Sequence, residues 1–217
     1  MILEGVIRRF TALKGGKAPL DARMTHQESL AVGQIEPINF EMTRAGRRFS
    51  LGNNGPITGI APVQALVTTA AQWVIWNTDT YRTMFFDEIG MYLTAGTPGV
   101  GGTLWAALVT APAQSGANTA GAAIASASNG GLASKAVVKS GVTITAPTAP
   151  VWMPIATNIS ANVTAFAGST SLEHRALSGA LAVPPGQGMA LAVVAPAGTT
   201  PLFAPFARWI EIETDME

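Results

Sequence analysis

The chain has 217 residues, of which 48% are hydrophobic and only 12% are charged, and its 13 basic and 13 acidic side chains balance. Because a typical soluble domain is about 25% charged, we expect other chains to cover much of the surface. The apolar runs are short and broken by proline or glycine, which excludes a membrane-spanning helix of about 20 apolar residues. The absence of cysteine excludes a disulfide framework and a thiolate metal site.

Residues 1–50 are the basic part of the chain, with eight of the 13 Lys and Arg residues and five of the 13 acidic residues. Residues 1–24 are interrupted by glycine and proline and include Arg8 and Arg9, so we predict an extended N-terminal arm. Such an arm either binds an acidic protein surface or nucleic acid, or is an ordinary solvated terminus. Its few apolar residues do not form a signal peptide, which favours synthesis in the cytoplasm.

Two elements are expected in the lead-in that follows the arm. Thr25 and Glu28 have the spacing of a helix capping box, which predicts a short helix over residues 26–32. Alternating apolar and polar residues then predict a strand over residues 35–42.

A basic cluster of Arg44, Arg47 and Arg48 ends the lead-in. Arginines so close together can contact phosphates. Phe49 is the only aromatic residue next to the cluster that could stack on a base, so nucleic-acid binding is not expected. A solvated loop or a salt-bridged contact with another subunit is the favoured interpretation.

The stretch from residue 73 to residue 109 organises the rest of the chain. Trp73 to Trp76 is aromatic and β-branched and predicts a strand, and the Asn and Asp residues of 77–80 predict a tight turn. A long strand is predicted over residues 81–94, with Phe85, Ile89, Met91 and Leu93 on one face. The strand over residues 104–109 is apolar on both faces and therefore needs cover on both sides, from a second sheet or from another subunit.

No charged side chain occurs between Thr94 and Ser134. The Ala, Gly and Ser residues in this span are compatible with a flexible loop, but burial between subunits is the other interpretation. Because lasting interfaces are depleted of charge at their core, we predict a homo-oligomer, a trimer or larger.

The C-terminal part reads as a series of short strands. Two apolar runs around the turn of residues 184–188 predict a hairpin over residues 176–195. Further strands are predicted over residues 135–145, 151–157, 158–166 and 202–213. About eight to ten strands without a helical period predict an all-β fold over residues 51–217, an antiparallel β-sandwich resembling a jelly roll.

Residues that could carry catalysis or hold a metal are sparse. His26 and His174 are far apart in the sequence, and Asp87 and Glu88 are adjacent, which would place them on opposite faces of a strand. The glycine-rich segment of residues 96–103 lacks the lysine of a phosphate-binding loop, so we predict a hairpin loop there. We therefore predict no catalytic residue, no metal and no cofactor. The residues predicted to lie in an interface are Arg8, Arg9, Arg44, Arg47, Arg48, Trp105 and Trp152.

Three segments together resemble small jelly-roll virion proteins of tailed bacteriophages: DEIGMYLTAGTPGVGGTL, VPPGQGMALAVVAPAGTTP and the closing ARWIEIE. The VPPG turn also resembles trimeric jelly-roll modules of the tumour-necrosis-factor-like shape. The resemblance extends over residues 57–213. It implies a β-sandwich without a cofactor that assembles on a virion, often as trimers, with the arm docked on the capsid or on neighbouring subunits.

The resulting hypothesis is a non-enzymatic decoration, cement or minor head protein of a phage capsid, made in the host cytoplasm and bound to major capsid or other virion proteins. An alternative is the receptor- or carbohydrate-binding head of a fibre or spike, for which Trp73, Trp76, Asn77 and Asp79 could supply the site. An enzyme with a cupin-like barrel would need a histidine-rich metal site, which the sequence lacks.

Overall fold

The computed structural model covers the whole chain and divides it into two units, residues 1–41 and residues 42–217. Residues 48–50, which the sequence analysis assigned to the lead-in, belong to a strand of the second unit. The structure describes residues 22–24, 30–32, 42–53, 58–65, 68–96, 102–110, 116–119, 122–126, 133–144, 150–158, 173–195 and 201–213.

The first unit contains one antiparallel strand pair, β1 (Ala22–Met24) with β2 (Leu30–Val32). The helix predicted over residues 26–32 is therefore wrong at its C-terminal end, where the chain is extended and pairs with β1. The strand predicted over residues 35–42 lies outside the described residues except for Met42, which begins a helical turn that ends at Arg44.

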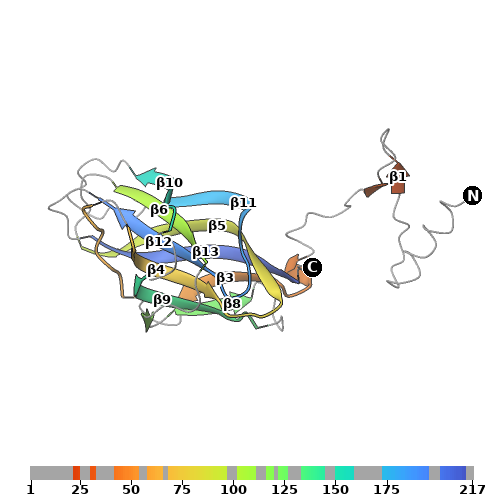
Figure 1. The fold of residues 1–217 in the computed structure, drawn as a ribbon, viewed down its shortest axis with the longest axis horizontal. Helices are drawn as coiled ribbons and strands as arrows, with labels where there is room; N and C mark the ends of the chain where they lie inside the picture. Colours follow the sequence, from red (N-terminus) through yellow and green to blue (C-terminus); the bar gives the residue numbers. More distant parts are fainter. Residues whose placement is uncertain are drawn as a thin grey trace, which may run out of the picture. The chain divides into compact units, whose positions relative to one another are not determined.

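The second unit is a sandwich of two antiparallel sheets (Figure 1). The six-stranded sheet has the order β10 (Met153–Asn158), β6 (Gly102–Val109), β12 (Gly188–Val194), β4 (Ala70–Asn77), β9 (Ala136–Thr143) and β7 (Ala117–Asn118). The five-stranded sheet has the order β11 (Glu173–Val183), β5 (Arg82–Ala95), β13 (Leu202–Glu213), β3 (Arg48–Asn53) and β8 (Ala122–Ser126). The prediction of an all-β antiparallel sandwich is confirmed.

Strand pairing in this unit is nested along the chain. Without β7, β8 and β9, eight strands remain. The first of these pairs with the last, the second with the second to last, and so on inward: β3 with β13, β4 with β12, β5 with β11, and β6 with β10. The three remaining strands form an insertion between β6 and β10, which adds β8 beside β3 and adds β9 and β7 beside β4.

Nested pairing sends most connections from one sheet to the other. β11 and β12 flank the turn of residues 184–187, yet β11 pairs with β5 and β12 pairs with β4 and β6. The predicted hairpin over residues 176–195 is therefore wrong, because the turn joins the two sheets. The predicted hairpin loop of residues 96–103 likewise joins β5 of one sheet to β6 of the other. Proline and glycine predict where the chain turns, but they do not predict whether the two strands that flank a turn pair with each other.

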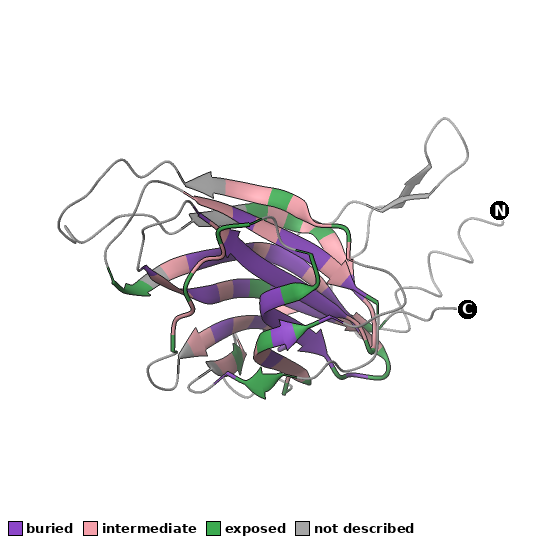
Figure 2. Ribbon diagram, turned by 60° about the vertical axis from the view of Figure 1, so that its left-hand side comes forward, coloured by how far each residue is buried: buried purple, intermediate pink, exposed green. Residues whose placement is uncertain are grey.

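The core between the sheets contains large side chains from both of them, among them Trp73, Phe86, Met189 and Trp209, all fully buried. Figure 2 shows how the buried residues follow the central strands. Trp209 is in tilted contact with Phe49 and Phe86, with ring centroids 6.3 and 5.8 Å apart. Such aromatic pairs add stabilisation beyond their buried area.

A second apolar cluster covers the other face of the six-stranded sheet. Along β4, Trp73 and Ile75 face the core whereas Val74 and Trp76 belong to this outer cluster. Ala107 and Val109 of β6 and Ala190 of β12 join them. The prediction that residues 104–109 need cover on both sides is met within the single chain, where Val137 and Trp152 pack on the outer cluster.

A bulge at Asp87 changes which side chains of β5 face the core. Glu88 pairs with Arg208 and Phe86 pairs with Trp209, so Asp87 has no opposite residue in β13. Phe86 is therefore buried and Phe85 is not, which corrects the face predicted for Phe85. Strict alternation fails at a bulge because the extra residue reverses the faces that follow it.

Candidate functional site

The structure pairs two arginines of the predicted basic cluster within the chain. Arg47 lies 3.2 Å from the carboxylate of Glu213, and Arg48 Nε lies 3.4 Å from Oδ2 of Asp87. Arg44 is exposed on the helical turn, and Arg8 and Arg9 lie outside the described residues. Arg47 and Arg48 of the cluster are therefore held in ion pairs within the chain.

The two predicted interface tryptophans are both half-buried. The indole N–H of Trp152 donates to the carbonyl of Thr68 at 2.8 Å, and the ring packs on the outer apolar cluster. The indole nitrogen of Trp105 is buried and has no hydrogen-bond partner among the described residues. Trp152 thus covers part of its own sheet.

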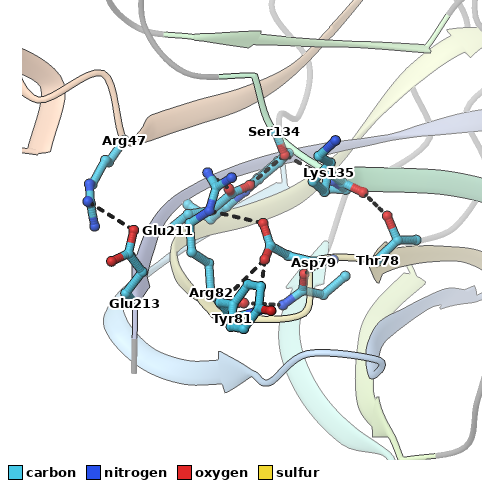
Figure 3. A network of polar contacts seen from close by, with 12 residues as sticks. Arg47, Thr78, Asp79, Tyr81, Arg82, Ser134, Lys135, Glu211 and Glu213 are labelled. Atoms are coloured by element: carbon cyan, nitrogen blue, oxygen red, sulfur yellow. Dashed lines mark hydrogen bonds and ion pairs between the residues drawn. The ribbon is translucent and has the colours of Figure 1, made fainter. Parts of the chain in front are cut away.

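A polar network closes one end of the sandwich (Figure 3). The carboxylate of Glu211, which is 2% exposed, accepts a hydrogen bond from Arg82 NH1 at 3.0 Å and another from the indole of Trp209 at 3.1 Å. The hydroxyl of Ser134 donates to the same carboxylate. Glu211 lies on the inner face of β13 with Trp209, as alternation predicts. Its three donors could not be predicted, because Arg82 and Ser134 are distant in the sequence.

Asp79 fixes the turn that precedes β5. Its Oδ1 accepts hydrogen bonds from the amides of Tyr81 and Arg82 at 2.8 and 3.2 Å, and its Oδ2 lies 2.9 Å from Arg82 Nε. Burial on its own would raise the pKa of Asp79, but these hydrogen bonds and the guanidinium outweigh burial and lower the pKa below its ordinary value. The turn holds Tyr81 at the surface, 75% exposed.

Asn77 joins this turn to the one between β11 and β12. Its side-chain amide donates to the carbonyls of Arg82 and Val183 at 2.8 and 2.9 Å. Its backbone N–H donates to Gln187, and its carbonyl accepts from Gly186. The sequence predicted the turn residues but not this link, because the partners are distant in the chain.

The residues considered for a carbohydrate site are not available to a ligand. Trp73 and Trp76 are 0% and 3% exposed, and both Asn77 and Asp79 are buried in the contacts just described. Tyr81 is the large exposed side chain closest to them in the sequence.

Asp87 and Glu88 lie on the same outer face of the five-stranded sheet, which corrects the opposite faces predicted for them. The bulge places both between the core residues Phe86 and Ile89. Each carboxylate forms an ion pair with an arginine. Oε2 of Glu88 lies 3.1 Å from NH1 of Arg208, and Oδ2 of Asp87 lies 3.4 Å from Nε of Arg48. Burial raises the pKa of Asp87 and the charge of Glu88 adds to the rise, while the arginines oppose it.

Among the described residues, β7 and β8 are edge strands of different sheets, and a gap lies between them. A cavity of about 280 Å³ lies there, lined by Thr119, Ile124, Ser134 and the chain around Val138. Thr119 donates its backbone N–H to Val138, but its buried hydroxyl has no hydrogen-bond partner among the described residues. Nothing in the sequence pattern singled out these residues, since small polar side chains are common in loops.

Among the described residues, no three His, Asp or Glu side chains gather as a metal site would require. In the same part of the chain, no helix is long and apolar enough to cross a membrane. Comparison of the chain with protein families, with curated proteins and with solved structures finds no match.

Proposed function

We propose that the chain is a non-enzymatic structural protein of a bacteriophage virion, a decoration, cement or minor head protein of the capsid. It assembles through contacts between its own copies, as a trimer or larger, and through contacts with the major capsid protein or other virion proteins. It carries no cofactor, and its basic arm, residues 1–24 with Arg8 and Arg9, docks on neighbouring subunits.

The observation that carries this proposal is that uncharged sequence lies at the surface. Within the span that has no charged side chain, Thr110, Gly116, Ala117, Asn118 and Ala125 are exposed. A soluble surface normally carries many charges. An uncharged exposed edge is what a surface looks like when another protein covers it in the assembled state.

The nested pairing supports the finer proposal of a jelly roll. In that fold eight antiparallel strands form two sheets from two Greek keys. The pairs β3 with β13, β4 with β12, β5 with β11 and β6 with β10 have this order. Jelly rolls are common in viral capsid proteins.

The described charged groups also support a structural role. Asp79, Asp87, Glu88, Glu211 and Glu213 each lie in an ion pair with an arginine of the same chain. Each of these carboxylates is therefore bound by a partner within the chain. A general acid or base would instead need a group directed at a substrate.

Quantitative mass spectrometry of purified particles tests the proposal. The phage genome that encodes the chain is expressed with the wild-type gene and, as a matched comparison, with a gene lacking residues 1–24. We expect many copies per particle for the wild type and a lower number for the shortened chain. Particles that lack the protein would overturn the proposal, and a few copies per particle would indicate a spike instead.

A further inference from the structure

Four strands form the edges of the sandwich, and three of them carry features that prevent pairing with another chain. β7 has only two residues, and β10 carries the exposed Pro154. β11 is interrupted by a bulge in which Ser178 and Gly179 have positive φ, 50° and 79°. Short length, proline and bulges are the means by which natural sheets keep their edges from associating.

β8 carries none of these features. It has five residues, Ala122 to Ser126, without a charge, a proline or a register shift in its pairing with β3. Among the described strands it pairs on one side only, since β3 is its single neighbour in the sheet. Ala125 is exposed, and Ala123 is half-buried. An edge of this kind is a template for one more strand.

The gap next to β8 has room for side chains of an added strand. Ile124 packs against the core and lines the cavity of about 280 Å³. Pockets for drug-sized ligands measure roughly 300–1,000 Å³, so this cavity is small for a ligand of that kind. A strand added beside β8 would direct alternate side chains into the gap, next to Ile124 and the buried hydroxyl of Thr119.

The sequence of β8 is nearly symmetrical about its centre. If two copies pair in antiparallel fashion about Ile124, then Ala123 meets Ala125 of the second copy and Ile124 meets its own equivalent. Small residues then face small residues, and no like charges meet. A two-fold interface requires this kind of self-complementarity, because each copy offers the same surface.

We propose that β8 is an interface between two copies of this chain, in which the two β8 strands pair antiparallel and Ile124 of each copy closes the cavity of the other. The proposal rests on the assembly proposed above and names one of its surfaces. It is a two-fold contact, so it is distinct from the three-fold contact of a trimer and links one trimer to the next.

Disulfide trapping tests the pairing and its register, because the chain has no cysteine of its own. Two single variants, Ala123→Cys and Ala125→Cys, are purified separately, mixed and oxidised. Directly opposed Cβ atoms lie about 4.5–5.5 Å apart, close to the distance that a disulfide spans. We expect covalent dimers in the mixture and few with either variant alone, since identical positions lie diagonally about 7–8 Å apart.

The variant Ala180→Cys is the matched control, because Ala180 is an exposed alanine of the edge strand β11. If the mixture cross-links no more than this control, the pairing does not occur. Melting temperatures of all the variants establish that they are folded.

A second measurement compares Ala125→Lys with Ala180→Lys by light scattering. Lysine on an edge strand opposes pairing with another strand, so we expect Ala125→Lys to lower the mass of the assembly and Ala180→Lys to leave it unchanged. Equal masses for both variants and the wild type would remove the β8 contact while leaving the assembly proposal intact. A monomeric wild type would contradict the assembly proposal itself.

Discussion

Arg82 and Glu211 form a buried ion pair between the start of β5 and the end of β13, with NH1 of the arginine 3.0 Å from Oε2 of the glutamate. The two side chains are 16% and 2% exposed. Breaking a buried pair by removing one partner leaves the other charge without compensation in a poorly solvated site, and this costs more than the pair contributes.

We therefore expect Arg82→Met to lower the free energy of unfolding by about 3 kcal/mol. The reason is that Glu211 would remain buried with only Ser134 and Trp209 as donors. Urea denaturation measures the change. The control is Arg47→Met, which breaks the more exposed pair with Glu213 and should cost less than about 1 kcal/mol. A similar loss of unfolding free energy in both variants would show that the buried pair stabilises the fold no more than the exposed pair does.

Gly188 lies beneath the ring of Trp76, its cross-strand partner. A Cβ at this position would lie 2.5 Å from Cε3 of Trp76 and 2.8 Å from Cγ1 of Val74. We expect Gly188→Ala to destabilise the sandwich by about 1–3 kcal/mol, the usual cost of overpacking, as measured by thermal unfolding.

The matched control for this substitution is Gly52→Ala in β3, where the nearest atom to the new Cβ is 3.7 Å away. It should be neutral or slightly stabilising, because alanine restricts the unfolded chain. In a Trp76→Leu background, the cost of Gly188→Ala should fall. An unchanged cost there would mean that the ring is not the obstacle.

The lowered pKa of Asp79 predicts a pH dependence of stability. A carboxylate with a depressed pKa in the folded state stabilises the fold above the unfolded value, about 3.9, and this contribution disappears as pH falls through the lower folded value. We expect Asp79→Asn to be less stable than the wild type at pH 7 and the difference to shrink below about pH 4. Urea denaturation at a series of pH values measures it.

Asp87 should show the opposite trend, because burial raises its pKa. The folded state then binds a proton more readily than the unfolded state, so the ionised carboxylate disfavours folding as pH rises from about 3.9 through the higher folded value. The stability of Asp87→Asn relative to the wild type should therefore rise over this range. Parallel trends for the two asparagine variants would contradict the assigned directions.

Removal of residues 1–24 should leave the melting temperature of the sandwich nearly unchanged. The whole described core lies within residues 42–217, so the arm is not needed to complete it. Circular dichroism with thermal melting measures this. Loss of soluble, folded protein on truncation would show that the arm belongs to the folding unit.

Much of the strand content could be predicted from alternation and turn residues, because each of these depends on near neighbours in the chain. The bounds of β4, β5, β6 and β9 lie within three residues of the predicted bounds, and those of β13 match them. Pairing depends on distant residues, and this is why the predicted hairpin proved to be a connection between sheets. The bulge at Asp87 reversed the faces of β5 for the same reason, since β13 and β11 determine it.

The contacts of the site residues could be predicted less completely than the strands. The arginine cluster was recognised by charge, but its partners, Asp87 and Glu213, are far away in the sequence. Asn77 and Asp79 were identified as turn formers, and the structure shows that they also join two connections of the sandwich. The β8 edge could not be recognised, because a run of small residues looks like a loop until its pairing with β3 is known.

The mass of the purified full-length chain in solution tests the central claim of assembly most directly. Light scattering after size-exclusion chromatography measures this mass at micromolar concentration, away from any other protein. We predict an assembly of three or more chains, each of 22.4 kDa, because charged residues are depleted at the core of lasting interfaces, as they are along this exposed edge. A stable species of 22.4 kDa would contradict the claim.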